Sequence, residues 1–418
     1  MTIQISPGIL QGAVTAPSSK SFSIRALVAD YLAGGGSVLH NLSDCEDVLA
    51  AQKALVELPL GMPVECGESA LALHLIAPVA ALRSRPVLFG AQGTLRQRPL
   101  ASLVHALEVF GAQCNHSESG SLLRVEGPLR SGKNRLDGRF GSQAVSGLLM
   151  ALPLLDGDSE ITLLHPVSLP YIDLTLHVMH LFGVHIEAMP NPQSAEIRYL
   201  IPGGQSYRPT ELTVTGDWSG AAALMVAAAV SSAIYQRSEC VVRGVGAVDF
   251  AAPDSTIVEV LRAAGVLCMP LADGWKISVS DDLKPFVFDL THAPDLAPAL
   301  TALAAHIPGI SRLTGAGRLM SKESSRGEVL QQIFEQMGVQ IDLWADELVI
   351  YGGNRRDTSA LELVVDCRND HRIAMAVAIA TVGAQTPVTL SGASCIAKTY
   401  PRFWDDLALL GLRIQKIA

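Results

Sequence analysis

Residues 16–27 read Ala-Pro-Ser-Ser-Lys-Ser-Phe-Ser-Ile-Arg-Ala-Leu, which is the composition of a helix start. The proline disfavours helix before it, and Ser18 or Ser19 can accept hydrogen bonds from the unpaired amides of the first turn. Those amides and the positive end of the helix dipole favour an anion, and Lys20 and Arg25 add positive charge. Taken alone, the stretch fits a capped surface helix with solvated charges equally well.

The same pattern recurs along the chain: a polar or glycine-rich head, an apolar helix and then a β-like run. The further heads begin at Cys66, Gly138, Gly216, Asp289 and Asp366. A second helix in several copies ends at a glycine, a residue suited to the left-handed conformation that closes a helix. These glycines are Gly111, Gly183, Gly265 and Gly338, and we expect strands after them, for example over residues 184–186 and 339–341. The sequence therefore predicts six copies of one α/β unit, spaced too widely for the usual solenoid repeats.

Chain length indicates two domains, because 418 residues exceed what one core usually supports. Six copies divide into three and three. The loop over residues 203–209 lies near the midpoint and precedes the crossover to the second domain. With 49% hydrophobic and 17% charged residues, each domain should bury a large core.

The net charge of −9 argues against general nucleic-acid binding, which needs a basic face to replace phosphate counterions. The cations that the chain has are concentrated at the heads. We therefore expect a small anion as the ligand.

The seven cysteines include no Cys-x-x-Cys pair, which fits a reducing compartment and argues against a disulfide framework or a zinc site. No histidines have metal-ligand spacing, so we expect no metal. The N-terminus lacks a signal-peptide apolar region, and the longest apolar run, 221–230, is too short to span a bilayer. We expect a cytoplasmic protein that does not contact a membrane.

The second half contains the best candidates for catalysis. Asp295 lies at the head of an apolar helix. Lys322, Glu323 and Arg326 have i,i+4 and i,i+3 spacing, although a structural ion-pair cluster on a helix explains that spacing as well. No phosphate-binding Gly-x-x-x-x-Gly-Lys-Ser loop and no Gly-x-Ser-x-Gly elbow occurs, which disfavours nucleotide hydrolysis and the usual hydrolase chemistry.

Taken together, the heads resemble the enolpyruvyl transferases, and most closely the members that act on shikimate 3-phosphate, from about residue 10 to about residue 412. Nine motifs in family order carry the resemblance: Ser19-Lys20-Ser21 with Arg25, Arg98-Pro99, Ser142-Gln143, Ser168 with Pro170-Tyr171, Gly216-Asp217, Pro294-Asp295, Lys322-Glu323 with Arg326, Asp370-His371-Arg372, and Ala397-Lys398-Thr399.

The resemblance implies a two-domain inside-out α/β barrel, built from six βαβαββ units with three in each domain. It implies one domain of residues 1–18 plus 216–418, in which the N-terminal strand joins the C-terminal half, and a second domain of residues 19–215. It places the active site in the cleft between the domains.

The implied reaction transfers the enolpyruvyl (carboxyvinyl) group of phosphoenolpyruvate to the 5-hydroxyl of shikimate 3-phosphate. The reaction proceeds by addition and elimination through a tetrahedral intermediate, and it releases phosphate. It is a step of aromatic amino-acid biosynthesis in the shikimate pathway. No cofactor is needed, and we expect a monomer. Both substrates are anions, and bringing them together costs several kcal/mol of electrostatic repulsion. Converging cations and helix starts would offset that repulsion.

The resemblance also assigns roles to individual positions. The implied catalytic residues are Asp295, Glu323 and Lys20. Phosphoenolpyruvate would be held by Lys20, Arg98, Gln143, Arg326, Arg372 and Lys398. Shikimate 3-phosphate would be held by Ser21, Arg25, Ser142, Gln143, Ser168, Asp295 and Lys322.

One position departs from the family pattern and leaves rival functions open. His74 stands where the family usually has an arginine after a loop, here residues 68–73, so the anion pocket would lose a permanent charge. A non-catalytic anion-binding relative is therefore one alternative. The other is a UDP-N-acetylglucosamine enolpyruvyl transferase, but that pattern begins Lys-Asn and carries a reactive cysteine, whereas Ser21 follows Lys20 here and residues 90–98 hold no cysteine.

Overall fold

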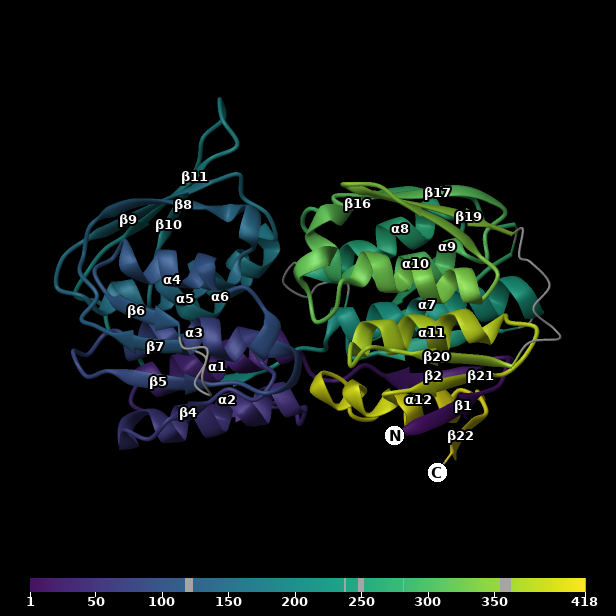
Figure 1. Cartoon of the computed structure of the whole chain (residues 1–418), viewed down its shortest axis with the longest axis horizontal. Coiled ribbons are helices and arrows are strands. Elements are labelled where there is room, and N and C mark those ends of the chain that lie inside the picture. The colour runs from purple at the N-terminus through teal and green to yellow at the C-terminus, as the bar shows by residue number, and fades with distance from the viewer. Residues whose placement is uncertain (117–122, 237, 247–251, 281, 354–361, 418) are drawn as a thin grey trace. The chain divides into compact units, whose positions relative to one another are not determined.

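The chain folds into two compact units in the computed structural model, which describes every residue from 1 to 417 except 117–122, 237, 247–251, 281 and 354–361. Unit 1 consists of Met1–Ser18 and Thr215–Ala418, and unit 2 consists of Ser19–Val214. The second crossing lies one residue before the position implied by the resemblance. Figure 1 shows the first two strands, in purple, among the yellow elements of the C-terminal end.

Unit 1 contains three four-stranded sheets and the helices between them. The strands are β1 (Thr2–Ile5), β2 (Gly12–Thr15), β13 (Cys240–Arg243), β14 (Leu267–Leu271), β15 (Gly274–Ser278), β16 (Val287–Asp289), β17 (Gly309–Thr314), β18 (Gln340–Leu343), β19 (Glu347–Gly352), β20 (Leu363–Asp366), β21 (Val388–Ser391) and β22 (Ile414–Ile417). The helices are α7 (Trp218–Tyr235), α8 (Ile257–Ala263), α9 (Ala297–Ala304), α10 (Arg326–Gln336), α11 (His371–Val382) and α12 (Phe403–Leu409), with 3₁₀ turns η5 (Pro253–Thr256), η6 (Pro294–Leu296), η7 (Ala316–Ser321) and η8 (Ala393–Lys398).

Unit 2 contains two four-stranded sheets and one two-stranded sheet. The strands are β3 (Val38–His40), β4 (Val64–Glu65), β5 (Val87–Gly90), β6 (Gln113–His116), β7 (Leu123–Glu126), β8 (Lys133–Asp137), β9 (Ser159–Leu164), β10 (Glu187–Pro190), β11 (Ile197–Ile201) and β12 (Glu211–Thr213). The helices are α1 (Lys20–Leu32), α2 (Glu46–Glu57), α3 (Ala70–Ala80), α4 (Ala101–Glu108), α5 (Gln143–Ala151) and α6 (Leu169–Leu181), with 3₁₀ turns η1 (Leu58–Leu60), η2 (Gly93–Gln97), η3 (Gly138–Phe140) and η4 (Leu152–Leu154).

The four-stranded sheets share one pattern, in which a parallel pair is extended by two antiparallel strands. In unit 1 the strand orders are β14-β15-β13-β2, β16-β17-β19-β18 and β20-β21-β1-β22, and in unit 2 they are β4-β5-β7-β6 and β10-β11-β9-β8. The sheet β12-β3 has only two strands. In that copy α2 runs through η1 almost directly into β4, which leaves no residues for two further strands.

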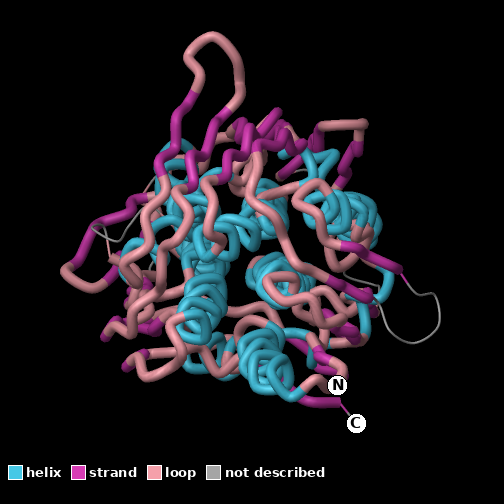
Figure 2. The backbone as a smooth tube through the Cα atoms, turned by 90° about the vertical axis from the view of Figure 1, so that its left-hand side faces the viewer, coloured by secondary structure: helices cyan, strands magenta, loops and turns pink. Residues whose placement is uncertain are grey.

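Helices form the interior of each unit. Every residue of α9 and α11 in unit 1 and of α3 in unit 2 is buried, and α7, α9 and α11 pack on one another. Figure 2 shows strands mainly at the periphery and helices within. Among the described residues, α7 is the one helix long and apolar enough to cross a membrane, but 78% of it is buried inside unit 1, as in the core helix of a folded domain.

Local sequence explains where the helices begin and end. Ser19 Oγ accepts from Phe22 N at 3.2 Å and begins α1, and Asp217 Oδ1 accepts from Gly220 N at 2.8 Å and begins α7. The predicted helix-ending glycines have positive φ angles, namely Gly111 (92°), Gly183 (82°), Gly265 (91°) and Gly338 (84°). These helix boundaries are therefore set by residues that can be recognised in the sequence.

Two local predictions are wrong. Residues 184–186 are not a strand, because Val184 N still bonds to Met179 O at 2.9 Å at the end of α6 and His185 N donates to Gln205 Oε1 at 2.8 Å. Strand β10 begins only at Glu187. Residues 322–325 are not helical either, since η7 ends at Ser321 and α10 begins at Arg326.

Candidate active site

A buried arginine in unit 1 is surrounded by three carboxylates. Arg326 is the first residue of α10, and its side chain is 1% exposed. Its Nε donates to Asp370 Oδ2 at 2.8 Å, its Nη1 donates to Asp295 Oδ1 at 2.9 Å, and its Nη2 donates to Glu323. Burial works to lower the pKa of Arg326, but the carboxylates, Asp370 foremost, outweigh burial and raise that pKa above its ordinary value.

The carboxylate of Asp295, on η6, contacts three cations. Besides Arg326, Lys322 Nζ lies 3.3 Å from Asp295 Oδ1, and Arg372 Nη2 lies 3.0 Å from Asp295 Oδ2. Burial lowers the pKa of Lys322, an effect that Asp295 opposes. The positive charge around Asp295 therefore comes from the loop after η7 and from the starts of two helices.

The head of α11 adds further groups to the same cluster. Asp370 Oδ1 accepts from Arg372 N at 3.0 Å and so caps α11, while Asp370 Oδ2 accepts from Ser324 Oγ at 3.0 Å. Lys398, the last residue of η8, is buried, and its Nζ donates to Asn369 O at 2.7 Å. Arg372 and Lys398 are thus both held at the start of α11.

A fourth carboxylate of unit 1 lies near this cluster. Asp254, on η5, is 1% exposed and accepts a hydrogen bond from Ser219 Oγ. Burial first and the charge of Asp295 second raise the pKa of Asp254 to about 6, although Arg372 and the Ser219 hydroxyl act in the opposite direction.

In unit 2 the starts of α1 and α2 meet through an ion pair. Lys20, the first residue of α1, lies with its Nζ 2.9 Å from Oδ2 of Asp47, the second residue of α2. The two side chains are 15% and 11% exposed, so solvent screens this pair less than a surface pair. Lys20 is therefore fixed at a helix start, where an anion also meets backbone amides.

Arg25 lies one turn further along α1 and is fully buried. Its Nε donates to Thr175 Oγ1 at 2.7 Å, its Nη1 to Ser21 O at 2.9 Å, and its Nη2 to Tyr171 O at 3.0 Å. Thr175 Oγ1 in turn donates to Ser146 Oγ at 2.9 Å. Burial lowers the pKa of Arg25 to about 10, so the guanidinium is still charged at neutral pH.

Two further helix starts of unit 2 carry predicted residues. Ser142 is the buried N-cap of α5, and Gln143 is the first residue of that helix. Ser168 is the buried N-cap of α6 with a φ of 53°, a conformation that is uncommon for a residue other than glycine. Such positions place hydroxyl and amide groups beside unpaired helix amides.

His74 is a buried histidine whose surroundings lower its pKa. It lies on α3, so residues 70–73, expected as part of a loop, are helical. His74 Nδ1 is 2.8 Å from Ala70 O, a contact that raises the pKa, but burial first and the charge of Arg98 second lower it to about 4. At neutral pH the histidine therefore adds no charge, as expected for a shorter donor in place of arginine.

No group of three or more histidine, cysteine, aspartate and glutamate side chains among the described residues is arranged to hold a metal ion. The two clusters instead combine helix starts, buried cations and partly exposed carboxylates. Such groups bind phosphate and carboxylate oxygens and can exchange protons with a bound molecule.

A comparison with protein-family models gives a match described as EPSP synthase (3-phosphoshikimate 1-carboxyvinyltransferase), over residues 5–61 and 55–407. The chain belongs to this family. A 3-phosphoshikimate 1-carboxyvinyltransferase of Clostridium perfringens (strain 13 / Type A) is 32% identical over 97% of both chains. One from Clostridium beijerinckii is 31% identical over 98% of this chain and 97% of its own.

Solved structures of EPSP synthases and enolpyruvyl transferases share the fold. An EPSP synthase from Acinetobacter baumannii superposes with a TM-score of 0.77 at 23% identity, with full coverage of both chains. The enolpyruvyl transferase NikO from Streptomyces tendae superposes with a TM-score of 0.76 at 18% identity, covering 99% of this chain and 98% of that one. The predicted fold class, a two-domain α/β fold of the enolpyruvyl transferase type, is confirmed.

Within each unit, many of the predicted family positions lie close together. In unit 1, Asp295, Lys322, Glu323, Arg326 and Arg372 form one connected cluster. In unit 2, Ser21 and Arg25 are joined by a hydrogen bond. The binding roles of these residues stay predictions.

Sequence reasoning missed the partners of these residues. No site role is predicted for Asp47, Asp254 or Thr175, and Asp370 is named only as part of a family motif. Its capping role could have been assigned from its place before His371 and Arg372 at a head, because aspartate is a preferred N-cap. No local signal identifies Asp254 or Thr175.

Proposed function

We propose that this chain transfers the enolpyruvyl group of phosphoenolpyruvate to the 5-hydroxyl of shikimate 3-phosphate and releases phosphate. One observation of the structure supports this most strongly: at the start of α10, Arg326 holds the partly exposed carboxylates of Asp295 and Glu323, and Lys322 from the preceding loop contacts the same Asp295 carboxylate. Membership of the EPSP synthase family agrees with the proposal.

In this proposal the cations bind the anionic groups of phosphoenolpyruvate. Its phosphate and carboxylate oxygens are taken by the cations Arg326, Arg372 and Lys398 of unit 1 and Lys20 and Arg98 of unit 2, together with the neutral amide of Gln143. Guanidinium groups suit both, because their paired N–H groups match two oxygens at once. Crowding a second anion beside the first costs several kcal/mol unless such charges surround it.

Shikimate 3-phosphate is assigned to Ser21, Arg25, Ser142, Gln143 and Ser168 of unit 2, and to Asp295 and Lys322 of unit 1. Arg25 already donates three hydrogen bonds within unit 2. Its main contribution is therefore to position Ser21 and Tyr171 and to supply positive charge. We infer that residues of both units act on the same pair of substrates.

The reaction needs a proton on the methylene carbon of phosphoenolpyruvate and attack of the 5-hydroxyl on the adjacent carbon. Asp295 takes the hydroxyl proton in this proposal. Glu323 and Lys20 together deliver the proton to the methylene carbon and assist the departure of phosphate. The double bond is restored when phosphate leaves and that carbon gives up a proton. No covalent bond to the protein and no cofactor is required.

We further propose that the protein works as a monomer in the cytoplasm. All seven cysteines are free thiols, which suits a reducing compartment. Sedimentation of the purified protein would test the monomer directly.

Phosphate release on mixing the purified protein with its substrates tests the proposed reaction. We expect stoichiometric phosphate when phosphoenolpyruvate and shikimate 3-phosphate are both present, and none when either is omitted. Binding of both without phosphate release would indicate a non-catalytic relative. Release only when UDP-N-acetylglucosamine replaces shikimate 3-phosphate would indicate the other enolpyruvyl transferase.

A further inference from the structure

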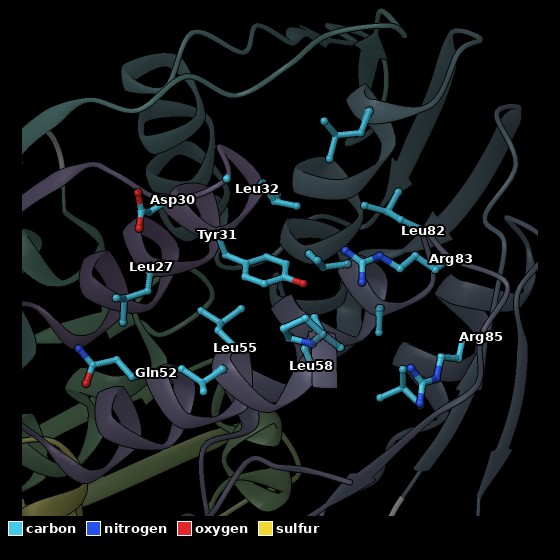
Figure 3. A pocket seen from close by; sticks show the side chains of 18 residues that line it. Leu27, Asp30, Tyr31, Leu32, Gln52, Leu55, Leu58, Leu82, Arg83 and Arg85 are labelled. Atoms are coloured by element: carbon cyan, nitrogen blue, oxygen red, sulfur yellow. The ribbon is translucent and has the colours of Figure 1, made fainter. Parts of the chain in front are cut away.

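Unit 2 contains a cavity of about 810 Å³ that none of the residues proposed for catalysis or substrate binding lines. It lies between the C-terminal halves of α1 and α2, η1 and the end of α3 (Figure 3). Its volume is within the range of pockets that bind small molecules, about 300 to 1,000 Å³.

The cavity is separate from the helix starts assigned to the substrates. Lys20 begins α1, whereas the cavity is lined by Leu27 and Tyr31 near the other end of that helix. Eleven residues of helix correspond to about 16 Å between Lys20 and Tyr31. The proposed substrates carry several charges and little apolar surface, so they do not match the lining described next.

Most of the lining is apolar. The lining includes Leu27 of α1, Leu55 of α2, Leu58 of η1, Val79 of α3 and Leu82 just after α3. Such walls favour a ligand with an apolar body, because water that leaves these surfaces is released to bulk.

One side of the cavity is cationic. Arg83 and Arg85 line it, and neither forms an ion pair within the part of the chain that the structure describes. In Figure 3 the Arg83 guanidinium and the Tyr31 hydroxyl point toward each other. The carboxylate of Asp30 lies on the opposite side, where its Oδ1 accepts from Ser37 N at 2.9 Å. In a chain of net charge −9, two arginines beside an apolar cavity select an anion.

We propose that this cavity binds a small amphipathic anion, with its apolar body between α1, α2 and α3 and its anionic head on Arg83 and Arg85. The Tyr31 hydroxyl donates a further hydrogen bond to that head. A carboxylate on a medium-length alkyl or aromatic body has the required chemistry, since guanidinium groups bind carboxylates through paired hydrogen bonds.

The test on the full-length protein uses one fluorescent probe and two competing ligands. Fluorescence titration with 8-anilino-1-naphthalenesulfonate, an aromatic anion, measures occupancy of the cavity. Its displacement by decanoate, compared with displacement by the neutral alcohol decanol, distinguishes the contribution of the anionic head to affinity from that of the apolar body. We expect one saturable site that both compounds compete for. In the double variant Arg83→Gln/Arg85→Gln, the decanoate affinity should fall about tenfold or more while decanol displacement is unchanged.

Matched variants control for charge and for cavity shape. Arg130→Gln/Arg208→Gln removes two exposed arginines of the same unit outside the cavity, and its decanoate affinity should equal that of the unaltered protein. Gln52→Phe fills part of the cavity from α2 and should reduce saturable binding of the fluorescent probe and of both competing ligands. All variants should keep normal phosphate release, because none alters a residue proposed for the reaction.

Two results would overturn the proposal. One is an unchanged decanoate affinity in the Arg83→Gln/Arg85→Gln variant, which would show that the arginines do not select the head. The other is the absence of saturable binding, combined with self-association in sedimentation that the Gln52→Phe variant loses. That result would show that a second copy of the chain covers this face. If Gln52→Phe does not fold, the arginine variant still decides the question.

Discussion

The three carboxylates around Arg326 differ in their access to a ligand. The side chain of Asp370 is 0% exposed and is occupied with Arg326, Ser324 and the cap of α11. Those of Asp295 and Glu323 are 20% and 18% exposed. A proton donor or acceptor must reach the reacting molecule, so Asp295 and Glu323 suit catalysis, whereas Asp370 suits positioning.

Replacement of Glu323 by Gln should lower kcat by about a hundredfold or more, the scale of a lost general acid or base. KM should change little, because glutamine keeps the size and an oxygen that can accept from Arg326. Steady-state phosphate release measures both constants. Glu328→Gln, which changes an exposed residue in the first turn of α10, is the control. Near-normal turnover in the Glu323 variant would remove this residue from the mechanism.

Asp254 predicts a pH dependence of stability. Its folded pKa of about 6 lies above its value in the unfolded chain, so the native state binds the extra proton between about pH 4 and pH 6. Protonated Asp254 therefore makes its whole contribution to the free energy of unfolding below about pH 4. That contribution is lost as the pH rises through about 6. Asp254→Asn mimics the protonated form and keeps an acceptor for Ser219.

Thermal denaturation of the Asp254→Asn variant and of the unaltered protein at a series of pH values measures this effect. The quantity compared is the difference between their unfolding midpoints. The variant should become relatively more stable as pH rises from 4 to 7. A difference that is constant over that interval would show that Asp254 ionises normally.

Helix starts and helix ends are the elements that the sequence predicts best. The heads at Ser19 and Asp217 and the closing glycines work through hydrogen bonds and φ angles within a few residues. The strand expected over 184–186 does not form, because the His185 amide donates to the side chain of the distant Gln205. The reduced sheet β12-β3 also depends on a partner strand far along the chain. Local chemistry is readable from sequence, and competition from distant segments is not.

The cap of α1 gives a prediction at this scale. Ser19→Ala removes the acceptor for Phe22 N and should lower the free energy of unfolding by about 1 kcal/mol. Ser19→Asp keeps a cap acceptor and should retain most of the stability. Urea denaturation followed by circular dichroism measures both. Equal stability of the alanine and aspartate variants would contradict the role assigned to this hydroxyl.

At the scale of the molecule, the repeats explain why the site residues are scattered in sequence. Lys20 and Asp47 are separated by 27 positions, Arg326 and Asp370 by 44, and Arg25 and Thr175 by 150. Family motifs include both Arg326 and Asp370, but only Lys20 and Arg25 of the other two pairs. The pairs Arg326–Asp370 and Arg25–Thr175 join different copies of the unit, whereas Lys20 and Asp47 lie on two helices of one copy. The N-terminal strand β1 shows the same dependence, since it completes a sheet with β21 and β22.

The central claim is that cations from both units bind the same substrate. Calorimetric titration of phosphoenolpyruvate into protein saturated with shikimate 3-phosphate tests it with Lys20→Gln from unit 2 and Arg372→Gln from unit 1. Exposed cations of each unit, changed in Lys53→Gln and Arg402→Gln, are the controls. The account predicts that Lys20→Gln and Arg372→Gln each lose about tenfold or more in affinity while both controls keep it. Unchanged affinity in either test variant would contradict the account.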